Sequence, residues 1–99
     1  MKIQSDETEI RGRWKMVGLK VEEDANARRI QALIGGYLKQ IARDESGWTT
    51  LYVDPSDQRF WELTYPEPDS HGGGPPMLRC LSENEVKEKY GEAAAKTTG

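Results

Sequence analysis

The sequence predicts an α+β domain in which one long amphipathic helix packs on a small antiparallel β-sheet, with a short C-terminal helix after it. Three observations predict this class. Apolar residues recur at helical spacing after Asp24, strand-like runs flank the turn sequence at 54–57, and Ser82 begins a capping box. The 99 residues have the size of one domain, and a single cysteine forms no internal disulfide. Polar composition predicts disordered segments at 1–9 and 92–99 around a domain at 10–91.

The first half of the domain is predicted to contain two short strands and the long helix. Between Ile10 and Val21 the alternation of apolar residues changes parity at Gly18, which indicates two strands around a turn or bulge. Asp24 is a suitable N-cap, and the apolar spacing after it predicts a helix to about Arg43. Gly35-Gly36 falls inside this helix, where each Gly costs about 1 kcal/mol relative to Ala. We therefore expect a close backbone contact or a kink there.

The second half is predicted to form a hairpin, a loop, a third strand and a short helix. Runs at 48–53 and 59–65 are rich in aromatic and β-branched residues and flank a turn. A loop rich in Gly and Pro follows, then a strand at 77–81 and a helix at 86–90. The expected core residues are Trp14, Ile30, Leu33, Ile34, Leu38, Ile41, Leu51, Trp61 and Leu63.

The sequence His71-Gly72-Gly73-Gly74 is similar to the oxyanion loop of some lipases, but the matching serine motif is missing. His71 and Cys80 each lack a second ligand at a metal-binding spacing. We therefore expect no catalytic residue, no metal and no cofactor. One alternative from another class stays open. A small binding module or enzyme could close this loop over an anionic ligand, with basic side chains such as Arg79 nearby.

Acidic side chains are concentrated in one part of the chain. Residues 44–69 contain seven acidic side chains and one basic side chain, whereas the net charge of the whole chain is -3. This charge disfavours a nucleic-acid partner, even though aromatic residues on the same strands could stack on bases. The sequence instead favours a basic protein partner, contacted by Asp54, Asp57 and Glu62 with the loop 71–74 at the edge.

We expect these three carboxylates to be exposed, so that reversing them to Lys leaves the fold intact. The alternative is that arginines elsewhere in the chain neutralise them as structural ion pairs. The arginines considered are Arg11, Arg13, Arg28, Arg29 and Arg79. With neither an apolar run of roughly 20 residues nor a signal-peptide pattern, the cytoplasm is the expected location and a membrane is not expected.

Several short motifs occur in a fixed order along the chain. They are Gly12-Arg13-Trp14, Asp44-Glu45-Ser46-Gly47-Trp48, Asp54-Pro55, Trp61-Glu62-Leu63-Thr64-Tyr65-Pro66 and His71-Gly72-Gly73-Gly74-Pro75-Pro76. Together they resemble the immunity protein 27 family of bacterial polymorphic toxin systems, over roughly Gly12 to Gly91. The resemblance implies a small intracellular protein that binds and blocks a cognate toxin, encoded by a neighbouring gene, and has no catalytic residues. Gly35-Gly36 and the tail after Gly91 depart from the family pattern.

Overall fold

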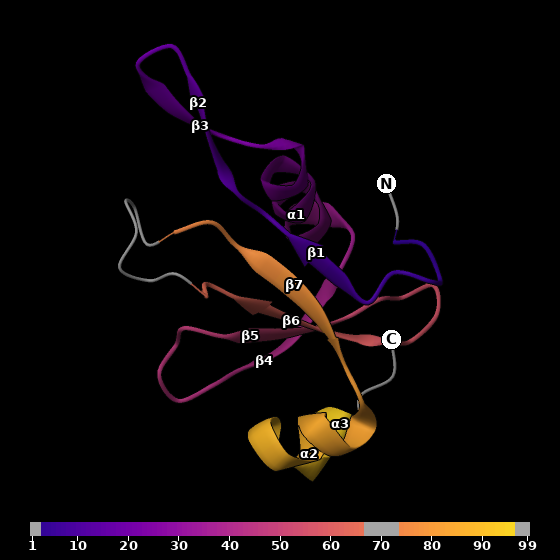
Figure 1. Ribbon diagram of the computed structural model, residues 1–99. Coiled ribbons are helices and arrows are strands. Elements are labelled where there is room, and N and C mark those ends of the chain that lie inside the picture. Colours follow the sequence, from indigo (N-terminus) through magenta and orange to yellow (C-terminus); the bar gives the residue numbers. More distant parts are fainter. Residues whose placement is uncertain (1–2, 67–73, 97–99) are drawn as a thin grey trace.

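The computed structural model describes residues 3–66 and 74–96. Within this part of the chain, an antiparallel sheet of five strands has the order β1-β7-β6-β5-β4 (Figure 1). The strands are β1 (Glu9–Arg11), β4 (Lys39–Arg43), β5 (Thr50–Val53), β6 (Phe60–Thr64) and β7 (Met77–Leu81). The predicted hairpin is confirmed, because β5 pairs with β6 and Tyr52 lies opposite Trp61.

Helices cover both faces of this sheet (Figure 1). On one face lies α1 (Ala25–Gly36), and on the other lie α2 (Glu83–Tyr90) and α3 (Glu92–Ala95). Because side chains alternate along a strand, Trp61 of β6 joins the core beneath α1 and Phe60 joins the core beneath α2. The first core contains Ile3, Ile10, Ile30, Leu33, Leu38, Tyr52, Trp61, Leu63 and Leu78. The second contains Leu51, Phe60, Leu81, Val86, Ala94 and Ala95.

The predicted long helix was wrong in its second half. The α1 helix begins after the Asp24 cap and ends at Gly36, and β4 occupies 39–43 as an edge strand beside β5. Gly35-Gly36 lowers the helix propensity at this end, and the Leu38 N–H donates to the Leu33 carbonyl as the chain turns. A Cβ atom on either glycine would meet nothing within 4 Å, so the expected close contact was also wrong.

The predicted core and C-terminal helix are confirmed in most positions. Trp61 and Leu63 are buried as expected, whereas Trp14, Ile34 and Ile41 are only half-buried. Ser82 forms the predicted capping box with Glu85 at the start of α2. The capping box satisfies backbone N–H groups that have no partner inside the helix.

The remaining strands, β2 (Trp14–Val17) and β3 (Lys20–Glu23), form a separate two-stranded sheet that projects from the body of the molecule (Figure 1). They confirm the two predicted strands before the helix. The turn between them contains Gly18, whose φ of +64° suits glycine. The hairpin formed by β2 and β3, residues 14–23, is called the projecting hairpin below.

The described residues near both ends of the chain contact the core. Ile3 is 4% exposed, and Ala94 and Ala95 of α3 are also buried. Arg59 donates from its guanidinium to the carbonyls of Gln4 and Glu7, which holds this segment against the sheet. The domain boundaries at residues 10 and 91 stay a prediction. The described residues outside them, 3–9 and 92–96, include buried, helical and hydrogen-bonded positions.

Gly12 offers a direct test of packing between the loop before β7 and α1. Its N–H donates to the Pro76 carbonyl at 2.8 Å, and an added Cβ would lie 2.8 Å from that oxygen and 3.0 Å from the Ala27 Cα. We expect Gly12→Ala to lower the free energy of unfolding by about 1–3 kcal/mol. Gly35→Ala is the matched control and should raise it by up to about 1 kcal/mol, because space is open there. Urea unfolding of both variants measures the difference, and an unchanged Gly12→Ala would contradict this packing.

Candidate partner-binding site

Asp54 is a structural residue and not an exposed contact. It is 0% exposed, and its Oδ1 accepts hydrogen bonds from the Tyr37 hydroxyl at 2.7 Å and the Ser56 N–H at 2.8 Å. Its own N–H donates to the Arg59 carbonyl across the base of the turn. The carboxylate therefore closes the β5–β6 turn and connects it to Tyr37, the residue that follows α1.

Glu62 is also buried, at 1% exposure, in the middle of β6. Its carboxylate accepts a hydrogen bond from the Tyr90 hydroxyl at 2.7 Å and lies 2.7 Å from Lys89 Nζ and 3.7 Å from Arg79. Burial and the adjacent Glu62 carboxylate raise the pKa of Tyr90, although its contact with Thr49 acts in the opposite direction. The Tyr90 hydroxyl thus stays protonated as a donor. These contacts make Glu62 the centre of an internal ion-pair network that joins α2 to the sheet.

Asp57 alone of the three predicted carboxylates keeps an accessible side chain, at 31% exposure. Its Oδ2 lies 2.7 Å from Arg59 Nε, so its charge is balanced by a neighbour on the same hairpin. Two carboxylates of the acidic segment are therefore paired with cations in three dimensions, Asp57 with Arg59 and Glu62 with Lys89 and Arg79. The ion-pair alternative describes these contacts better than an open acidic surface does, although the expected role in partner binding stays a prediction.

The Gly-rich loop is described only in part. His71, Gly72 and Gly73 lie outside the described residues, and Gly74 is buried with a φ of +83°. Its positive φ explains a glycine at this position. Arg79, which the anion-binding alternative requires, lies near Glu62 and Glu85, at 3.7 and 3.9 Å. This pairing weakens the case for Arg79 as a free cation beside the loop.

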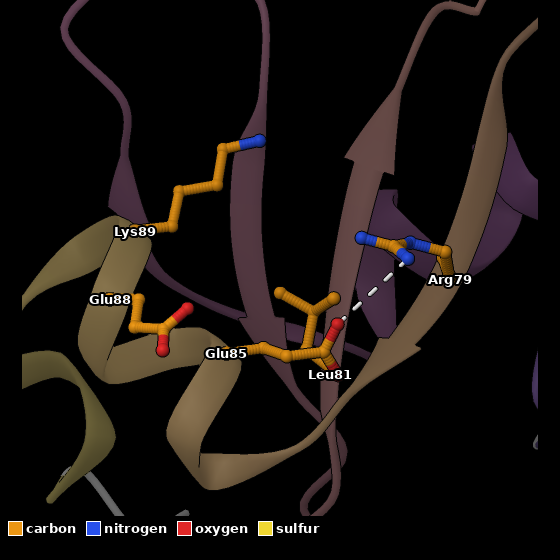
Figure 2. A pocket seen from close by; sticks show the side chains of 5 residues that line it. All are labelled: Arg79, Leu81, Glu85, Glu88 and Lys89. Carbon is orange, nitrogen blue, oxygen red and sulfur yellow. Dashed lines mark ion pairs between the residues drawn. The ribbon is translucent and has the colours of Figure 1, made fainter.

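A shallow pocket of about 260 Å³ lies between α2 and β7 (Figure 2). Figure 2 shows Arg79 and Leu81 on the strand and three charged side chains on the helix. The helical residues are Glu85, Glu88 and Lys89. Charges of both signs line the pocket, and Arg79 and Lys89 already pair with carboxylates. In residues 3–66 and 74–96, no group of three His, Cys, Asp or Glu side chains is placed to hold a metal ion.

Large apolar side chains are exposed in two places that were not predicted from the sequence. The first is the projecting hairpin, where Met16 is 65% exposed and Leu19 is 100% exposed. The second is Trp48, which is 59% exposed. The sequence contained one sign of this exposed surface. Leu19 follows the turn glycine Gly18, at a position where residues are usually polar. By contrast, Tyr52, Phe60 and Trp61 are buried, as the core interpretation of the hairpin aromatics predicts.

Trp48 is presented by a well-ordered turn between β4 and β5. The Asp44 carboxylate accepts hydrogen bonds from the Ser46 hydroxyl at 2.8 Å and the Gly47 N–H at 2.9 Å. The Ser46 hydrogen bond lowers the pKa of Asp44, so the carboxylate remains ionised over a wide pH range. Gly47 adopts a φ of +78°, which closes the turn, and Trp48 follows it two residues before β5 begins at Thr50.

Residues 16–82 match the family model described as Immunity protein 27. The chain belongs to this family. The match confirms the resemblance seen in the motifs, and it runs from the projecting hairpin to the Ser82 cap of α2. The immunity protein 27 segment thus runs from the second half of β2 to β7, while β1, the first two residues of β2 and both C-terminal helices lie outside the matched residues. No curated protein and no solved structure matches the chain. None of the described helices has the length and apolar composition needed to cross a bilayer.

Proposed function

We propose that this chain is an immunity protein that binds a cognate bacterial toxin and neutralises it by forming a complex, without chemistry of its own. The observation that carries the proposal is the family match over residues 16–82. The fold supports it, because a small folded body with exposed apolar side chains at Met16 and Leu19 suits a protein interface. The immunity protein acts in the cytoplasm of the cell that produces it and protects that cell. The toxin is encoded by a neighbouring gene.

The contacts proposed for the interface differ from those expected from charge alone. Asp54 and Glu62 are buried, so neither can meet a toxin without the domain opening. Apolar anchors surrounded by polar side chains provide most of the binding energy in typical interfaces. The net charge of -3 contributes to the rate at which a basic partner approaches, and this contribution falls as salt rises.

Co-expression tests the proposal. The toxin gene beside this chain is induced in a bacterial host with and without the chain, and colony survival is counted. We expect toxicity alone and survival together, with the two proteins purifying as a one-to-one complex. Loss of viability despite abundant folded immunity protein, with no complex on size exclusion, would contradict the function.

A further inference from the structure

We propose that the toxin binds this chain at the projecting hairpin, and that the apolar face of the hairpin inserts into an apolar cleft of the toxin. The inference rests on the proposed function, because it identifies the surface through which that function is carried out. It is independent of Asp57 and Glu62, whose carboxylates pair with Arg59 and Lys89 within the domain.

The strand register gathers apolar side chains on one face of the projecting hairpin. Met16 lies opposite Val21, and Trp14 lies opposite Glu23 two residues away. Since paired residues share a face and alternate residues return to it, Trp14, Met16 and Val21 form one apolar stripe, with Glu23 beside Trp14 at the base of the same face. Met16 and Val21 are 65% and 49% exposed, and no described segment covers them. The stripe is therefore available to a partner.

The tip of the projecting hairpin carries a further exposed apolar side chain. Val17 pairs with Lys20, so the turn consists of Gly18 and Leu19 only. Glycine at the first of two turn positions is typical of the tight turns that match strand twist. Leu19 at the second position is 100% exposed, and the turn geometry does not require an apolar residue there. An exposed leucine that folding does not use is a candidate anchor for binding.

The base of the projecting hairpin is fixed to α1. The Asp24 Oδ1 accepts hydrogen bonds from the Arg13 N–H at 3.2 Å and the Ala27 N–H at 2.8 Å. The Asp24 N–H in turn donates to the Arg13 carbonyl at 3.0 Å. Because an isolated two-stranded hairpin is only marginally stable, these contacts orient it against the body. A pre-oriented element loses little conformational entropy on binding.

The charges of the projecting hairpin select an apolar partner surface. Lys15 and Lys20 are balanced by Glu22 and Glu23, and Lys15 lies directly opposite Glu22 on the face away from Met16. The hairpin is therefore neutral, whereas the whole chain carries a net charge of -3. A hairpin with no net charge and an apolar stripe on one face complements an apolar cleft and not a strongly charged one.

The exposed apolar area favours a cleft of the toxin over a second copy of this chain as the surface that covers the hairpin. The exposed apolar side chains of the hairpin offer on the order of 500 Å², less than the roughly 800 Å² that each partner buries in a standard interface. Two hairpin tips meeting each other would bury only part of that area. A cleft would cover the apolar face, the tip and the free strand edges of the hairpin, which projects away from the sheet and helices (Figure 1).

Calorimetric titration tests the proposal with the purified, catalytically inactivated toxin domain encoded beside this chain. We expect Leu19→Asp and Met16→Asp each to weaken binding by about 30-fold or more, as for a central anchor of an interface. Leu19→Met should bind within about threefold of the wild type, because it keeps an apolar side chain of similar volume. Trp48→Asp is the control, since Trp48 is similarly exposed but lies on another loop, and it should change binding by less than about threefold.

The outcomes separate this inference from the proposed function. If the wild type binds and protects but Leu19→Asp and Met16→Asp bind equally well, the hairpin inference is overturned and the function stands. If the folded wild type neither binds nor protects, both fail. An equal loss in Trp48→Asp would overturn the assignment to the hairpin. A wild-type dimer that Leu19→Asp converts to monomer in sedimentation would make a second copy the occupant and overturn the proposal. Thermal melts confirm that each variant is folded.

Discussion

Replacing Glu62 with Lys is expected to unfold the domain under conditions in which the wild type is folded. The new ammonium group would be buried at a position 1% exposed, beside Lys89 and Arg79, and the hydrogen bond from Tyr90 to the carboxylate would be lost. Breaking a buried ion pair costs about 3–5 kcal/mol, and like charges add to this. Because domains of this size have about 5–15 kcal/mol of stability, the loss is a large share of the total.

Asp57→Lys is the matched control for this prediction. Its side chain is 31% exposed and pairs with Arg59 at the surface, so the same change should cost only about 0–1 kcal/mol. Circular dichroism during urea unfolding measures both variants. Equal stability of the two would show that Glu62 is not held as described. The expectation that all three carboxylates can be reversed with the fold intact is therefore replaced by one that applies to Asp57 alone.

Trp61→Ala is expected to lower the free energy of unfolding by about 3–5 kcal/mol. The Trp61 side chain is 0% exposed beneath α1, and the Arg59 guanidinium lies over its ring at 5.0 Å. Truncation removes the largest fully buried side chain among the described residues and leaves a cavity. Chemical denaturation followed by tyrosine and remaining tryptophan fluorescence gives the change.

Trp61→Phe separates the loss of area from the loss of the indole N–H. The Trp61 Nε1 is buried and has no hydrogen-bond partner among the described residues, so its removal relieves an unsatisfied donor. We expect Trp61→Phe to cost less than half of what Trp61→Ala costs. If both variants lower the free energy of unfolding equally, the indole N–H would stabilise the fold through an interaction other than these contacts.

Most of the fold could be predicted because its signals are local. Turn residues mark the β5–β6 hairpin, and the capping box at Ser82 marks the start of α2. The end of α1 could not, because Leu38 and Ile41 continue the helical spacing, and the alternation expected of β4 is interrupted by a register shift between Gln40 and Ala42. Pairing of β4 with β5 decides between the two, and this contact is not visible in a single segment.

The candidate site was harder to predict because its interactions are between distant segments. A count of charges along 44–69 cannot show that Arg79 and Lys89 meet Glu62. The same count treats Asp54 as exposed, although Tyr37 and Ser56 enclose it. The alternating residues at 14–21 predicted strands correctly, but alternation does not reveal whether a strand faces a core or a partner.

The position of β1 has a consequence for the order in which the molecule assembles. Strands β4, β5, β6 and β7 each pair with a neighbour in sequence, whereas Arg11 of β1 meets Met77 of β7 across 66 residues. Closing so long a loop is slow compared with forming adjacent hairpins. During synthesis on the ribosome, β1 leaves the exit tunnel before the other strands of the sheet, and we expect it to join the sheet after them. Until β7 has emerged, Ile10 lacks Leu78, the residue opposite it in the finished sheet.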